Sequence, residues 1–139
     1  MSGTFQGVGT LQFTPDNKNS YAYSGAISIN NETKTFLEFT TDDYILLSKI
    51  LLTGGFGYID ANKKIRLRVS FNNTVISYNS HMFNASSSFA DLDPLLVTIP
   101  PFTKVTIDVT TDQTSAINYY VLFNAEVKNS GGVRGNLDE

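Results

Sequence analysis

Strict alternation of apolar and other side chains runs through four separate stretches of this 139-residue chain. Successive side chains of a β-strand point to opposite faces of a sheet, so a period of two predicts a strand with one buried face. The pattern occupies residues 21–29, 64–71, 104–110 and 117–128. In the first stretch it places Tyr21, Tyr23 and Ile27 on one face. Together the four stretches predict an antiparallel, all-β protein.

Shorter segments fill the gaps between these stretches. Weaker strands are expected at residues 10–14, 34–40, 74–79 and 95–99. The Asn72-Asn73 pair before the third of them suits a tight hairpin, because Asn tolerates a positive φ. Residues 44–52 fit a helix, with Leu46, Leu47 and Ile50 at helical spacing, but also a strand. We favour the strand because the run is short and its neighbours are strands.

Eight or nine short strands separated by Gly, Asn and Pro turns predict a single β-sandwich domain. An immunoglobulin core is excluded because the chain has no Cys and no Trp. A single jelly roll of about eight strands fits the count best, although periodicity does not distinguish it from other sandwich topologies. We expect an N-terminal arm at residues 1–9, the sandwich at 10–129 and a polar C-terminal tail at 130–139.

Charge and hydropathy argue against two classes of partner. The net charge is −3, and the closest basic residues, Lys63, Lys64, Arg66 and Arg68, fit a solvated strand face. Proteins that bind nucleic acid usually carry a basic stripe, because they must neutralise phosphates. No apolar run approaches the roughly 20 residues that span a bilayer. We therefore expect neither nucleic acid nor a membrane as a partner.

Groups capable of catalysis are sparse. The one histidine, His81, is expected in a loop and has no nucleophile motif beside it. The carboxylate pairs Asp42-Asp43 and Asp91-x-Asp93 fall at strand ends, where Asp is an ordinary turn residue. With one His and no Cys, the chain leaves only oxygen ligands for a metal, so the metal site considered is Ca²⁺ at Asp91 and Asp93. We expect no enzyme, and no catalytic, cofactor-binding or metal-binding residues.

The aromatic residues indicate an alternative function. Sugar-binding sandwiches stack aromatic rings on pyranose faces, and the chain has seven tyrosines. Most of them fall inside the predicted strands, where packing also explains them. Tyr58 and Tyr120 are the exposed candidates. A carbohydrate-binding or receptor-binding module, such as part of a tail fibre, is therefore the alternative to a structural role.

One family resemblance extends over residues 21–128. It is carried by the strand–diproline–strand run at residues 95–107, by Ser24-Gly25 and by residues 36–40, within a short, Cys-free chain rich in Thr and Asn. In these features the chain resembles single jelly-roll proteins of virus particles. Within that class it is most similar to the capsid cement, or decoration, proteins of tailed phages.

The resemblance implies a non-enzymatic protein on the outer surface of a virion. Its partners would be the major capsid protein and further copies of itself, commonly in a homotrimer, with arms reaching between subunits. No cofactor is implied. The expected contact residues are Phe5, Val8, Phe102, Val133 and Arg134.

Overall fold

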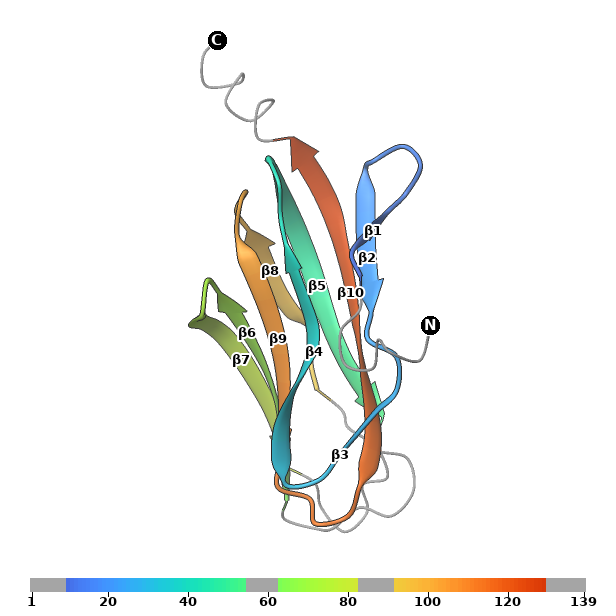
Figure 1. Ribbon diagram of the computed structural model, residues 1–139, viewed down its shortest axis with the longest axis vertical. Helices are drawn as coiled ribbons and strands as arrows, with labels where there is room; N and C mark the ends of the chain where they lie inside the picture. Colours follow the sequence, from blue (N-terminus) through green and yellow to red (C-terminus); the bar gives the residue numbers. More distant parts are fainter. Residues whose placement is uncertain (1–9, 55–62, 83–91, 130–139) are drawn as a thin grey trace.

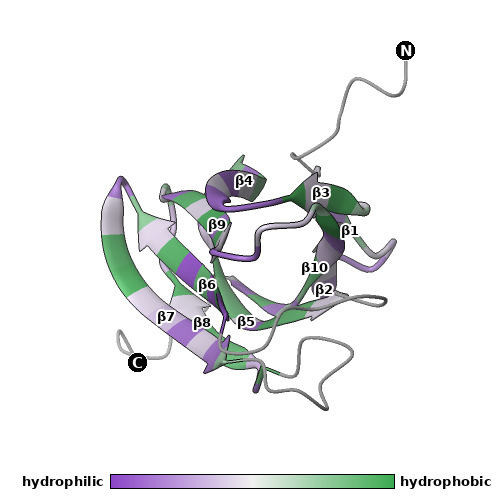
Figure 2. Ribbon diagram, turned by 90° about the horizontal axis from the view of Figure 1, so that it is seen from below, coloured by the Kyte–Doolittle hydropathy of each residue, from purple (hydrophilic) through white to green (hydrophobic). Residues whose placement is uncertain are grey.

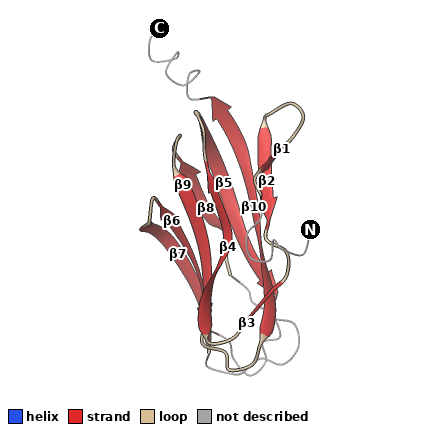
Figure 3. Cartoon of the chain, in the orientation of Figure 1, coloured by secondary structure: helices blue, strands red, loops and turns tan. Residues whose placement is uncertain are grey.

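In the residues that the computed structural model describes, all regular secondary structure is β-strand (Figure 3). The structure describes residues 10–54, 63–82 and 92–129. The strands are β1 (Gln12–Phe13), β2 (Asn19–Tyr23), β3 (Ile27–Ile29), β4 (Glu32–Thr40), β5 (Tyr44–Gly54), β6 (Lys64–Phe71), β7 (Thr74–Met82), β8 (Leu95–Ile99), β9 (Lys104–Thr111) and β10 (Ile117–Asn129). The expected arm at residues 1–9 and tail at 130–139 lie outside the described residues.

Two antiparallel sheets pack face to face (Figure 1). The six-stranded sheet has the order β1-β2-β10-β5-β8, with β3 also paired to β10, and the four-stranded sheet has the order β4-β9-β6-β7. Around the β6–β7 hairpin, β5 pairs with β8, β4 pairs with β9, and β2 and β3 pair with β10. This nesting of four antiparallel pairs, placed alternately in the two sheets, is the jelly-roll topology. It confirms the predicted fold class.

The core lies between the two sheets and follows the alternation of the sequence. Along β6, Ile65, Leu67 and Val69 are buried while Lys64 and Arg66 are exposed. The same alternation is visible as bands of green and purple along the strands (Figure 2). Phe39 and Phe123 meet edge to face across the core, with ring centroids 5.0 Å apart. Burial of this apolar face is the main stabilising contribution to a sandwich of this kind.

Residues 44–52 form part of strand β5, as favoured above. Leu46, Ser48, Ile50 and Leu52 are buried, and the residues between them face outward. The buried Ser48 hydroxyl donates a hydrogen bond to the carbonyl of Val97, 2.6 Å away. β5 lies between β10 and β8, so its backbone groups are satisfied on both sides. This pairing decides against the helix that the leucine spacing also permits.

Residues 21–29 form two strands, which corrects the predicted single strand. Tyr23 pairs with Leu122 and Ile27 with Tyr119, so the chain inserts one extra residue between these two pairs. The bulge contains Gly25 at φ 77°. One inserted residue reverses which face the side chains occupy. Tyr21 and Tyr23, expected on the same face as Ile27, therefore lie on the outer face, while Ala22 and Ile27 are buried.

Strand ends also differ in detail from the prediction. The N-terminal strand is only the two residues of β1, and β7 extends to Met82, so His81 lies in a strand rather than in a loop. Asn72 and Asn73 have φ values of 50° and 72° and join β6 to β7. This confirms the tight hairpin, since two positive φ angles are the mark of a type I′ turn.

Candidate functional site

The groups weighed for catalysis do not converge. His81 is opposite Ile65 near one end of the four-stranded sheet, where Ile65 also pairs with Thr111 of β9. Asp42 and Asp43 follow Thr40, which pairs with Lys104 at the other end of β9. The length of β9 separates the two places by about 23 Å. They cannot form one active site.

The other candidates are also dispersed. Asp93 is exposed, and its carbonyl accepts a hydrogen bond from the Asn79 amide at 2.8 Å, while Asp91 lies outside the described residues. Within residues 10–54, 63–82 and 92–129, no three His, Cys, Asp or Glu side chains are grouped so that they could hold a metal ion. That part of the chain also contains no helix long and apolar enough to cross a membrane.

Phe102 occupies an unusual position between β8 and β9. Its side chain is 71% exposed, and its φ of 54° is in the left-handed region. A residue with a Cβ adopts that region at a cost of about 1–2 kcal/mol. Of the predicted contact residues, Phe102 is the one within the described part of the chain.

Hydrogen bonds to Thr41 and Asp42 hold this loop, residues 100–104, which we call the Phe102 corner. The Phe102 N–H donates to the carbonyl of Asp42 at 2.8 Å. The Thr41 hydroxyl donates to the carbonyl of Pro100 at 2.8 Å and accepts from the Thr103 N–H at 2.9 Å. Thr41 and Thr103 are almost fully buried. The exposed phenyl ring is therefore carried on a backbone that tertiary contacts fix.

The hairpin and the C-terminal strand reach the same end of the sandwich. The Lys104 N–H donates to the Asn72 side-chain oxygen at 3.0 Å, which joins the hairpin to the Phe102 corner. Asn129, at the end of β10, pairs with Tyr44, two residues after Asp42. The last described residue of β10 therefore lies at the same end of the sandwich as the Phe102 corner. The predicted contacts Val133 and Arg134, like Phe5 and Val8, lie outside the described residues.

The outer face of the four-stranded sheet carries ion pairs beside the exposed Tyr78 and Met82 of β7. Arg68 and Asp108 form an ion pair at 3.2 Å, and Asp108 also accepts from the Thr35 hydroxyl at 2.9 Å. Lys104 and Glu38 are 3.0 Å apart. These four charged groups thus have partners within the protein.

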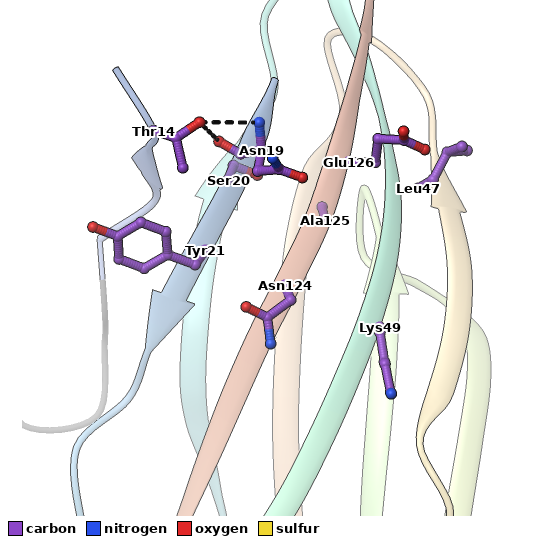
Figure 4. A pocket seen from close by; sticks show the side chains of 9 residues that line it. All are labelled: Thr14, Asn19, Ser20, Tyr21, Leu47, Lys49, Asn124, Ala125 and Glu126. Atoms are coloured by element: carbon purple, nitrogen blue, oxygen red, sulfur yellow. Dashed lines mark hydrogen bonds between the residues drawn. The ribbon is translucent and has the colours of Figure 1, made fainter. Parts of the chain in front are cut away.

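The outer face of the six-stranded sheet carries the exposed apolar side chains of Tyr21, Tyr23, Leu47 and Leu96. A groove of about 500 Å³ crosses it (Figure 4). The residues lining the groove come from the β1–β2 turn and from β2, β10 and β5: Thr14, Asn19, Ser20, Tyr21, Leu47, Lys49, Asn124, Ala125 and Glu126.

The tyrosines divide between the core and this outer face. Tyr119 is fully buried in β10, and burial raises the pKa of its hydroxyl to about 12, against a smaller opposing effect of the Thr111 hydroxyl. Tyr120, predicted to be exposed, is half-buried and meets Tyr23 edge to face at 5.8 Å. Tyr58 lies outside the described residues. Sequence reasoning missed Tyr21 and Tyr23 as outer-face residues, and Ser24-Gly25 was the available sign of a bulge.

Comparison with known proteins identifies no family. No family model matches the chain, and no curated protein matches it. Among solved structures, a family 6 carbohydrate-binding module is similar with a TM-score of 0.38 and 12% identity, covering 82% of this chain and 79% of that one. A cycloisomaltooligosaccharide glucanotransferase of Paenibacillus sp. has a TM-score of 0.35 and 15% identity, covering 85% of this chain and 18% of its own. Likenesses of this size carry no conclusion about function.

Proposed function

We propose that this protein is a non-enzymatic structural protein of a virus particle, which attaches to the outside of the capsid shell and stabilises it. The observation that carries the proposal is the exposed ring of Phe102 on a strained, hydrogen-bonded corner. Backbone strain that persists because its surroundings impose it is found mainly at functional positions. Exposed aromatic side chains are frequent anchors of protein interfaces.

Two further features support attachment through this end of the sandwich. The Phe102 corner is rigid before binding, so little conformational freedom has to be lost when it docks. Strand β10 ends at Asn129 at this same end of the sandwich. Only 17% of the residues are charged, compared with about 25% in typical domains, and interface cores are depleted in charge. The partners would be the major capsid protein and further copies of this chain.

The test is co-sedimentation of the purified protein with capsid shells assembled from the major capsid protein of the proposed virus particle. Phe102→Gly removes the anchor and leaves a residue suited to a positive φ. We expect this variant to lose attachment while keeping the circular dichroism of a β-sheet protein. Leu96→Ala, at a site that is 77% exposed, is the matched control and should attach normally. Deleting residues 1–9 or 130–139 should weaken attachment with the β-sheet signal unchanged.

The proposal fails if the unaltered protein does not sediment with the shells. The role of the corner is refuted if Phe102→Gly attaches as well as the unaltered protein. Light scattering after size exclusion tests self-association, since a homotrimer would have three times the 15.3 kDa mass of one chain. The alternative, a carbohydrate- or receptor-binding module, needs a ligand site elsewhere on the molecule, and attachment through the Phe102 corner neither requires nor excludes one.

A further inference from the structure

Three side chains form a row across the groove on the six-stranded sheet. Tyr21 of β2 pairs with Asn124 of β10, and Asn124 pairs with Lys49 of β5. All three are exposed on the outer face. Neighbouring strands are about 4.8 Å apart, so the row extends over about 10 Å. An aromatic ring, an amide and an ammonium group thus line one shallow groove (Figure 4).

These polar groups are available to a ligand. Within the described part of the chain, the side chains of Tyr21, Asn124 and Lys49 make no hydrogen bond or ion pair to the protein. The four-stranded sheet provides the contrast, because its Arg68 and Asp108 are paired with each other at 3.2 Å. The amide of Asn124 offers both donors and an acceptor, which is what vicinal hydroxyls require.

The aromatic surface continues beyond Tyr21. Tyr23 lies two residues further along the same face of β2, about 7 Å away, and is 52% exposed. Tyr120 contacts the Tyr23 ring edge to face and restrains it. Two exposed rings in line present apolar faces to more than one ring of a chain-like ligand.

The charge of the groove selects among ligands. Lys49 and Glu126 are the only charged side chains among the described residues that line it, and their charges are opposite. A polyanion such as nucleic acid would need several cations here, because phosphate contacts supply most of its affinity. A neutral ligand with apolar faces and many hydroxyls matches the groove better.

From these observations we propose that the groove lined by Tyr21, Asn124 and Lys49 binds a neutral oligosaccharide. The Tyr21 ring stacks on the apolar face of a sugar ring, and Asn124 and Lys49 form hydrogen bonds to its hydroxyls. Tyr23 stacks on a neighbouring sugar ring. Because the Phe102 corner is a separate site, this proposal does not depend on capsid attachment.

The experiment is NMR titration of the ¹⁵N-labelled full-length protein with three probes: maltohexaose, cellohexaose and mannohexaose. At least one should shift backbone amide signals of β2, β10 and β5 around residues 21, 124 and 49. Tyr21→Ala should weaken this binding about tenfold or more, as expected when a stacked ring is lost. The matched control is Tyr78→Ala, which removes an exposed tyrosine of β7 in the other sheet and should bind as the unaltered protein does.

Several results would overturn the proposal. One is the absence of shifts with all three hexasaccharides at millimolar concentration, and another is shifts that map to other strands. Equal losses in Tyr21→Ala and Tyr78→Ala would also refute it. If the outer-face signals move with protein concentration instead of with sugar, the face is an interface between copies of the chain. A protein that binds sugar but does not attach to capsid shells would contradict only the proposed function. A protein that attaches to the shells but binds no sugar would contradict only this proposal.

Discussion

Two glycines with positive φ, one in open space and one against a neighbouring strand, provide a matched test of how tightly β5 and β10 pack. Gly25 has φ 77° with nothing within 4 Å of the position that a Cβ would occupy. Gly54 has φ 124°, and a Cβ there would be 2.6 Å from the Asn118 carbonyl oxygen and 2.7 Å from the Tyr119 Cα. Alanine at either site is strained by the backbone angle, but only at position 54 does it also collide with the neighbouring strand.

The expected losses follow from these contacts. A left-handed backbone costs a residue with a Cβ about 1–2 kcal/mol, and the lower entropy of unfolded alanine offsets about 0.5–1 kcal/mol of this. Gly25→Ala should therefore lower the free energy of unfolding by about 0.5–1 kcal/mol. Gly54→Ala adds the cost of overpacking against backbone atoms, about 1–3 kcal/mol. Its total loss should be about 1.5–4 kcal/mol.

The assay is urea denaturation of the two variants and the unaltered protein, followed by circular dichroism. With a slope of about 2 kcal/mol per molar urea, the midpoint of Gly54→Ala should fall by about 0.8–2 M and that of Gly25→Ala by about 0.3–0.5 M. Equal midpoints for the two variants would refute the reasoning, because they would mean that the β5–β10 pair moves apart at no cost.

Two further predictions concern Tyr119 and the hairpin. The pKa of Tyr119 is raised to about 12 in the folded protein, so the unfolded chain loses this proton first, near pH 10. The free energy of unfolding should therefore fall by about 3 kcal/mol as the pH rises from 10 to 12. Tyr119→Phe should lack this part of the decline in urea denaturations at increasing pH, and identical declines would contradict it. Asn73→Gly should raise the free energy of unfolding by about 0.5 kcal/mol, because Asn-Gly is the preferred type I′ pair. A lower urea midpoint would contradict the assigned turn.

The sequence predicted the fold class because burial of one strand face leaves a period-two pattern that needs no partner to be recognised. In β6, for example, Ile65, Leu67 and Val69 alternate with charged residues, and all three are buried. The Asn72-Asn73 turn was predictable for a similar reason, since its backbone angles depend on those residues alone. Phe102 was predicted as a contact residue, and that role stays a prediction, whereas its left-handed conformation was not predicted.

Tertiary structure decided the features on which the two proposals depend. Residues 44–52 are compatible with helix and strand, and pairing with both β10 and β8 selects the strand. The left-handed backbone of Phe102 is held by hydrogen bonds that the N–H groups of Phe102 and Thr103 donate to Asp42 and Thr41, which are distant in sequence. The bulge at Gly25 turns Tyr21 and Tyr23 outward, because the register of β2 and β3 is set by β10 about 100 residues later. Local pattern determines which residues can be strands, whereas pairing between distant segments determines which face each side chain occupies.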